Sequence, residues 1–328
     1  MLSSYKNIIT WLVKILIGLV SFVIIYWRLK DDLTSDKLQH IQNSFSTLTA
    51  YCLLFSCLLL VPLNWGIESY KWKLITTPVE EIPFSKAVKS VLAGLCVGNL
   101  APGRATEFVA KVLFFRSENR GTITLLHFVN GLFQLSITIV LGLIALLSKY
   151  NLSNDISSTQ FLLIGISCML LLSLFILFVF KFNMLQKWIF SLFKKSLGER
   201  TMPYKFKKES ILRLVFFSFI RYLVFTTQFV LILKIFYTGS LNSSILASVC
   251  VYFLLTTILP MISFIEPAIR AAVALLVFGG LEISEISLVT TAILVWLINI
   301  VIPSVIGYYI IVIEKFDADS YRDSLFKK

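Results

Sequence analysis

Two short charged segments interrupt apolar sequence, and each of them follows a proline. Glu107 stands four residues before Lys111 in the first segment, and Glu266 stands four residues before Arg270 in the second. Residues four apart share a face of a helix, so each acid can pair with its cation. Both segments lie where the hydropathy otherwise indicates membrane, and ionisable groups at that depth are costly and mark functional sites. We therefore treat both pairs, together with Arg104, as candidate substrate-binding residues.

A single arginine, Arg221, lies within the apolar stretch 211–236, about two helical turns from its charged beginning. At that depth it should pair with a carboxylate or a phosphate, and the acids expected to meet it are Glu107 and Glu266. The guanidinium presents a planar fork of donors that matches phosphate oxygens. A buried ion pair and a headgroup-phosphate site therefore both stay open.

A polar stripe lies in the apolar stretch 122–147. Four residues recur there at spacings of three and four: His127, Asn130, Gln134 and Thr138. This period places them on one helical face. One interpretation is hydrogen bonding between helices, and the other is the polar wall of a hydrated cavity. Asn130 and Gln134 join the candidate binding residues on the second interpretation.

Metal, cofactor and nucleic-acid chemistry find no support in the sequence. Its two histidines cannot form a metal cluster alone, and its five cysteines fall in apolar stretches without metal spacing. We find no nucleophile elbow and no Walker loop, and we expect no cofactor. The net charge of +12 is concentrated in 181–213, where nine basic residues face Glu199 and Glu209 for a net +7. A basic loop between apolar spans is typical of a cytoplasmic loop, so we expect membrane lipids rather than nucleic acid as partners.

The composition indicates a multi-pass protein of the cell (inner or cytoplasmic) membrane. Hydrophobic residues make up 57% of the chain and charged residues only 15%, which leaves too little polar surface for a soluble domain. A span needs about 20 apolar residues. Six stretches meet this requirement: 11–28, 45–63, 122–147, 160–181, 211–236 and 286–312. The predicted fold is an all-α polytopic transmembrane helical bundle.

Two less regular apolar stretches leave the number of spans open. Residues 87–101 are short and end at Pro102–Gly103, and residues 244–280 are broken by prolines and Glu266. If both are re-entrant or broken helical hairpins, the chain has six full spans with both termini inside. If they cross fully, it has eight to nine spans. Both arrangements obey the positive-inside rule, and we prefer the hairpins because 87–101 is too short to span.

The chain reads as one integral membrane domain over 1–328. Its possible halves, 1–181 and 211–313, are joined by a basic cytoplasmic loop at 182–210. Within that loop, residues 183–197 mix Trp, Phe and Leu with lysines and suit a short amphipathic helix on the membrane surface. Residues 64–73 read as an aromatic and basic collar at the membrane interface.

Three motifs resemble those of a known family. Asn64-Trp65 with Lys71-Trp72-Lys73 is the first, and Gly98 to Glu107 with Lys111 and Arg116 beyond is the second. The third is Pro260 followed by Glu266, Gly279-Gly280 and a last span with Pro303. In order and spacing they resemble the flippase-like integral membrane family typified by the transmembrane region of lysylphosphatidylglycerol synthases. The resemblance covers about 10–315.

The chain departs from the family pattern at two places. Thr106 stands where the family usually has Gly before the first acid, and residues 261–265 are not Gly-rich before the second. No counterpart of the soluble aminoacyl-transferase domain is found, so we expect no lysine transfer from this chain alone. What the resemblance implies is the translocating part, which moves an anionic or modified lipid, or a lipid-linked sugar, between leaflets.

The sequence therefore predicts a flippase-like membrane lipid or lipid-linked glycan translocase that binds an anionic headgroup in a central polar cavity. Two alternatives stay open. The chain could be a non-transporting membrane partner of a separately encoded lipid-modifying enzyme, with the 181–213 loop as the docking surface. Less favoured is an intramembrane lipid transferase with Glu107 or Glu266 as base, since it needs a second acid or metal ligand that the sequence does not place nearby.

Overall fold

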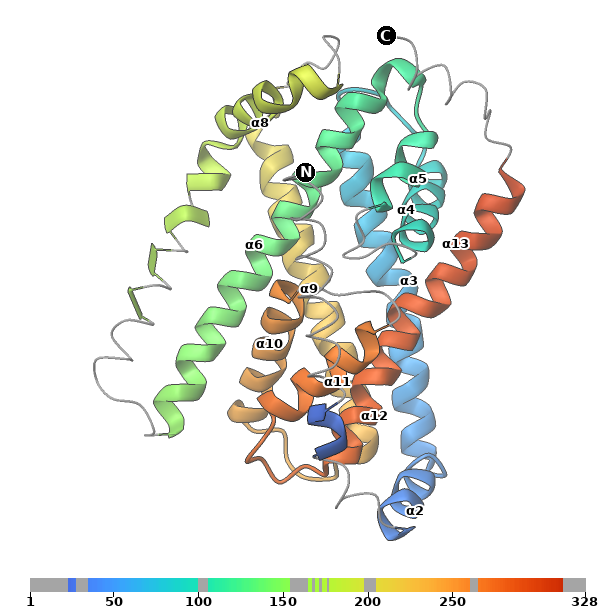
Figure 1. The fold of residues 1–328 in the computed structure, drawn as a ribbon, viewed down its shortest axis with the longest axis vertical. Coiled ribbons are helices and arrows are strands. Elements are labelled where there is room, and N and C mark those ends of the chain that lie inside the picture. Colours follow the sequence, from blue (N-terminus) through green and yellow to red (C-terminus); the bar gives the residue numbers. More distant parts are fainter. Residues whose placement is uncertain are drawn as a thin grey trace, which may run out of the picture. The chain divides into compact units, whose positions relative to one another are not determined.

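The computed structural model describes residues 23–27, 35–99, 106–153, 165–166, 169–170, 173–175, 177–197, 205–259 and 265–314. The elements found within these ranges are helices, apart from turns and connecting segments (Figure 1). They confirm the all-α prediction. The predicted span 11–28 lies largely outside the described residues, and 160–181 is described only in short pieces. Arg104 and the breaks at Pro102–Gly103 and Pro260 lie outside them.

Four helical segments are long and apolar enough to cross a membrane. They are α3 (Leu48–Thr76), the segment Ser117–Lys149 within and before α6 (Arg120–Ser153), α9 (Lys208–Phe236), and the segment Glu285–Ile313. The last consists of α12 (Glu285–Trp296), a π-helical turn (Leu297–Val301) and α13 (Ile302–Ile313). These four segments confirm the predictions at 45–63, 122–147, 211–236 and 286–312.

The remaining helices are shorter. They are α2 (Ser35–Ser44), α4 (Phe84–Gly98), α5 (Glu107–Leu113), a 3-10 turn (Ser117–Asn119), α8 (Phe182–Leu197), α10 (Ser243–Ile258) and α11 (Glu266–Val277). The irregular stretch 87–101 forms most of α4, which packs on α5 beyond the break, and the stretch 244–280 forms α10 and α11, which pack together. Paired short helices are what the hairpin prediction requires, and the number of full spans stays a prediction.

The chain divides into two compact units, and each takes residues from three separate stretches. Unit 1 contains the first part of α3, the end of α6, and residues 224–299. Unit 2 contains residues 62–140, 166–223 and 300 onward. The units do not coincide with the predicted halves 1–181 and 211–313, which stay a prediction.

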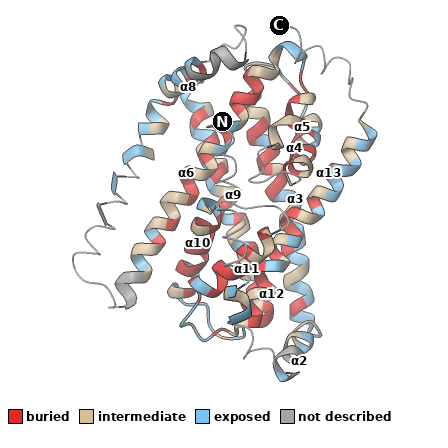
Figure 2. Ribbon diagram, in the orientation of Figure 1, coloured by how far each residue is buried: buried red, intermediate tan, exposed pale blue. Residues whose placement is uncertain are grey.

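Apolar side chains on the outside of the long helices fit a lipid environment. Tyr51, Phe55 and Leu59 are exposed on α3, and Val305, Tyr309 and Val312 are exposed on α13. Large apolar groups in such rows would be unfavourable in water, whereas lipid tails solvate them. Figure 2 shows buried and exposed residues alternating along these helices.

Unit 2 contains an antiparallel helix pair with a close backbone approach. A Cβ added at Gly98 would lie 3.0 Å from the Glu107 Cβ, and one at Gly94 would lie 2.6 Å from the Lys111 Cγ. The later residue of α4, Gly98, meets the earlier residue of α5, Glu107, and the earlier residue Gly94 meets the later residue Lys111. The two helices therefore run in opposite directions. The two glycines therefore let α5 lie directly on α4 and fix where Glu107 and Lys111 sit.

Candidate functional site

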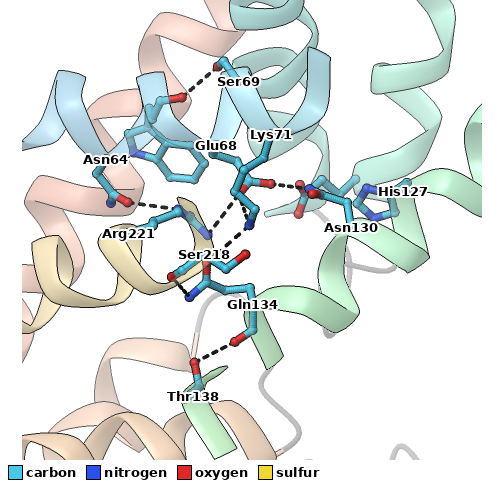
Figure 3. A network of polar contacts seen from close by, with 12 residues as sticks. Asn64, Glu68, Ser69, Lys71, His127, Asn130, Gln134, Thr138, Ser218 and Arg221 are labelled. Carbon is cyan, nitrogen blue, oxygen red and sulfur yellow. Dashed lines mark hydrogen bonds and ion pairs between the residues drawn. The ribbon is translucent and has the colours of Figure 1, made fainter. Parts of the chain in front are cut away.

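The carboxylate of Glu68 is the centre of a buried polar cluster in unit 2 (Figure 3). Its Oε2 lies 3.3 Å from Lys71 Nζ and 3.2 Å from an Arg221 terminal nitrogen. Its Oε1 accepts a hydrogen bond of 2.8 Å from Asn130 Nδ2. Two cations and one amide from three helices, α3, α6 and α9, thus converge on one acid.

Arg221 enters the cluster from α9 and is held on two sides. Its Nε donates to Asn64 Oδ1 at 3.0 Å, while the opposite side of the guanidinium reaches Glu68. The guanidinium carbon also lies 5.4 Å from the centre of the Trp65 ring, within cation–π range. Its side chain keeps 16% of its surface exposed, so Arg221 is less deeply buried than Lys71.

Lys71 is fully buried, and its second contact is an amide. Its Nζ donates to Gln134 Oε1 at 3.4 Å, and Gln134 Nε2 donates to the Ser218 carbonyl oxygen at 3.3 Å. The backbone carbonyl therefore orients the Gln134 amide with its oxygen toward Lys71. Thr138 donates to the Gln134 carbonyl one turn earlier. The polar stripe of α6 thus makes hydrogen bonds within unit 2, as the first of its two interpretations predicts.

A second charged group, Glu107 and Lys111 of α5, contacts the polar stripe of α6 at His127. Lys111 pairs with Glu107 at 2.7 Å, and its Nζ lies 3.4 Å from His127 Nδ1 and 5.1 Å from the centre of the Trp72 ring. An ammonium has no acceptor, so Nδ1 must be the accepting nitrogen of His127. Because His127 and Asn130 are three residues apart, one helical face carries contacts to both charged groups.

Trp72 and Ser90 connect this second group to α4. Trp72 Nε1 donates to Ser90 Oγ at 3.0 Å, and Ser90 Oγ donates to the Lys111 carbonyl oxygen at 3.1 Å. All three residues are buried. The position of Lys111 is therefore fixed through its backbone as well as through its ammonium group.

Cations exceed carboxylates in these two groups. Among the described residues, Lys71 and Arg221 share the Glu68 carboxylate and Lys111 pairs with Glu107, so three cations face two acids. Removing charges from water is costly unless they are paired, so a buried excess of this sign favours an anionic ligand. This arrangement can hold a phosphate or a carboxylate.

Unit 1 contains a simpler charged pair. In α11, Arg270 donates from Nε at 2.9 Å and from a terminal nitrogen at 2.7 Å to the same oxygen of Glu266. The Glu266 residue is buried, with 4% of its surface exposed. Both this pair and Glu107–Lys111 are confirmed as pairs four residues apart on one helix. Their role in binding stays a prediction.

The predicted partners of Arg221 were wrong. The structure pairs it with Glu68, which lies in the segment 64–73 that the sequence places at the membrane interface. The spacing contained the missed signal: Asn64, Glu68 and Lys71 recur at intervals of four and three, which puts them on one face of α3. Trp65, Trp72 and Lys73 beside them gave the segment the composition of a collar and concealed that face.

Metal ligation has no support in the part of the chain that the structure describes. No group of three or more His, Cys, Asp or Glu residues there could hold a metal ion.

Residues 11–312 match the family described as the lysylphosphatidylglycerol synthase TM region. The match spans almost the whole chain and includes every charged group described above. No curated protein matches the chain.

Proposed function

This chain belongs to the lysylphosphatidylglycerol synthase transmembrane-region family, and we propose that it moves a lipid with an anionic headgroup between the leaflets of the cytoplasmic membrane. One observation carries the proposal: the excess of cations over carboxylates around Glu68 and Lys111 in unit 2, where Lys71 and Lys111 are buried. A phosphate is the anion that membrane lipids and lipid-linked sugars share, and it is the group that an arginine fork binds with two oxygens.

The proposed binding step is an exchange of counter-ions at Arg221. A headgroup phosphate takes the place of the Glu68 carboxylate on the guanidinium. Glu68 keeps its contacts with Lys71 and Asn130, so the displaced acid is not left buried without a partner. This matters because an uncompensated buried charge is strongly destabilising, and an exchange that created one would not occur.

The same exchange would couple binding to a change in helix packing. The Arg221–Glu68 contact joins α9 to α3, and the Arg221–Asn64 hydrogen bond joins the same two helices. A phosphate bound by Arg221 competes for both contacts. Binding would therefore loosen the polar connection between the two helices within unit 2 while the apolar packing stays in place.

Other charged residues extend the proposal beyond Arg221. Lys111 of α5 offers a second cation beside His127 of α6, with Glu107 as the counter-ion that it would release. Arg104 precedes this pair in the sequence. Glu266 and Arg270, which the sequence also predicted to bind the headgroup, form a separate charged pair in unit 1.

The test is a leaflet-exchange assay in proteoliposomes with fluorescent phosphatidylglycerol, phosphatidylcholine and a lipid-linked sugar. We expect wild-type protein to exchange the anionic lipids, and we expect Arg221→Gln and Glu68→Gln to slow exchange about tenfold or more, which corresponds to ~1.4 kcal/mol. Lys89→Gln is the matched control, because it breaks the exposed Lys89–Glu314 ion pair of the same unit. It should leave exchange unchanged.

Three results would overturn the proposal. Wild-type exchange by a correctly folded Arg221→Gln variant would remove the counter-ion step. Absence of exchange by folded wild-type protein with every headgroup would instead favour a non-transporting partner of a lipid-modifying enzyme. Purified protein that changed the lipid covalently would favour a transferase.

A further inference from the structure

A second basic surface in unit 2 is formed where α8 meets the start of α9. Asn183 fastens the two segments together: its Nδ2 donates to the Phe206 carbonyl oxygen at 2.9 Å, and its Oδ1 accepts from the Phe206 amide at 2.8 Å. The Phe182 and Phe206 rings also meet, with centroids 5.4 Å apart. Residues 205–208 are therefore held beside the first turn of α8.

The two faces of α8 differ sharply. Phe182, Gln186 and Phe190 recur every four residues and are buried, and Phe182 packs on Phe133 of α6 with ring centroids 5.1 Å apart. The opposite face carries Met184 and Trp188, which are 66% and 59% exposed. In a helix these two lie one above the other, so they form a single apolar ridge.

Lysines border this ridge. At the helical period, Lys181 falls on one side of Met184 and Trp188, and Lys187 falls on the other, and both are exposed. The Asn183 clamp adds Lys205 and Lys207, which are also exposed, to the same end of α8. We name this surface the α8 platform, and it consists of Lys181, Met184, Lys187, Trp188, Lys205 and Lys207. Figure 2 shows the exposed residues along α8.

We propose that the α8 platform binds the surface of an anionic phospholipid bilayer. Met184 and Trp188 would lie at the boundary between headgroups and acyl chains, and the four lysines would contact lipid phosphates. This combination of an exposed apolar ridge with flanking lysines is the pattern of helices that lie in the membrane interface. Lysines near an anionic surface each contribute about a fivefold change in the binding equilibrium.

A lipid surface fits the platform better than a soluble protein does. Lysine is depleted in the buried centres of protein interfaces, whereas here lysines directly border the apolar ridge. Long lysine side chains can keep their ammonium groups among phosphates while their stems cover apolar surface. The platform is separate from the Glu68 cluster, so this inference does not depend on transport.

The test places a fluorescent reporter beside the ridge without altering it. Ser191 is exposed on the same face of α8, so Ser191→Cys in a Cys52→Ala background can be labelled with a polarity-sensitive dye. The labelled background without Ser191→Cys corrects for dye on other cysteines. The full chain is reconstituted into nanodiscs of phosphatidylcholine, with or without phosphatidylglycerol, that contain lipids with a nitroxide at the headgroup or deep in the chain.

We expect a blue-shifted emission and preferential quenching by the headgroup nitroxide, with both effects stronger in phosphatidylglycerol and weakened by salt. Replacing all four platform lysines by Gln should remove the dependence on phosphatidylglycerol, and Trp188→Ser should lower quenching. Lys86→Gln with Lys89→Gln is the matched control, since Lys86 is half-buried and Lys89 exposed on α4 of the same unit. It should change neither effect.

Three outcomes would overturn the inference. The dye could report water in both lipid mixtures, or its signal could ignore the platform lysines. It could also shift only after a soluble cell fraction is added, which would identify a protein as the occupant.

Discussion

Two charged sites in the described part of the chain balance their buried charges in different ways. The Glu266–Arg270 pair of unit 1 lies within one helix and is neutral, with two guanidinium nitrogens on a single carboxylate oxygen. The Glu68 cluster of unit 2 draws its members from three helices and adjoins the Lys111 group, with which it has one cation in excess. The charges of the local pair balance one another, whereas a cluster that gathers side chains from several helices and has a cation in excess is suited to receive an anionic ligand.

The largest effect should come from Glu68→Gln. This change leaves Lys71 and Arg221 without their carboxylate, while the amide oxygen that replaces it can still accept from Asn130. Removing one partner of a buried pair costs about 3–5 kcal/mol. We expect a large fall in the thermal unfolding midpoint in detergent, partly recovered by added phosphatidylglycerol. An unchanged midpoint would mean that the cations do not depend on Glu68.

The two sites should respond differently when both members of an ion pair are replaced by neutral residues. Glu266→Gln should destabilise unit 1 by leaving Arg270 without its carboxylate, and Glu266→Gln with Arg270→Gln should return most of the stability because neither charge of the pair remains. The corresponding double change of Glu68 and Lys71 should recover less, since Arg221 still lacks a carboxylate. Thermal unfolding of the four variants checks this. Equal recovery at both sites would erase the distinction between them.

The next largest effect on stability should come from widening the close contact between α4 and α5 in unit 2. At Gly94 an added Cβ would stand 2.6 Å from Lys111 Cγ and 3.0 Å from the Glu107 carbonyl oxygen, so Gly94→Ala must push α5 away from α4. Such overpacking costs about 1–3 kcal/mol. Gly66→Ala is the control, because nothing lies within 4 Å of its added Cβ and Ala favours helix. Its unfolding midpoint should stay level or rise.

The smallest effect should come from Lys149→Gln in unit 1. Lys149 Nζ donates to Ser248 Oγ at 2.9 Å and to the Val277 carbonyl oxygen at the end of α11. A cation at a helix C-terminus contributes about 0.3–1 kcal/mol. We expect a small fall in the midpoint, and Ser248→Ala should produce less. A fall as large as that of Glu68→Gln would show that Lys149 is a principal charge of unit 1.

Sequence patterns recovered the contacts that lie along one helix. Glu107 with Lys111, and Glu266 with Arg270, follow from the four-residue interval alone, because helix geometry fixes that interval. The stripe of Asn130 and Gln134 followed from the same period. The partner of Arg221 did not, since which helix faces α9 is a matter of packing, and the composition of 64–73 suggested an interface instead.

The sequence by itself determined that this protein is a helical membrane protein and which residues share a helix face. Both properties depend on local quantities, namely apolar length and the helical period, and the family match agrees with them. Only the tertiary structure decided that Glu68 is the acid on which Lys71, Arg221 and Asn130 converge. Convergence depends on side chains from α3, α6 and α9 meeting in space, and residues as far apart as Glu68 and Arg221 leave no periodic trace of that meeting in the chain.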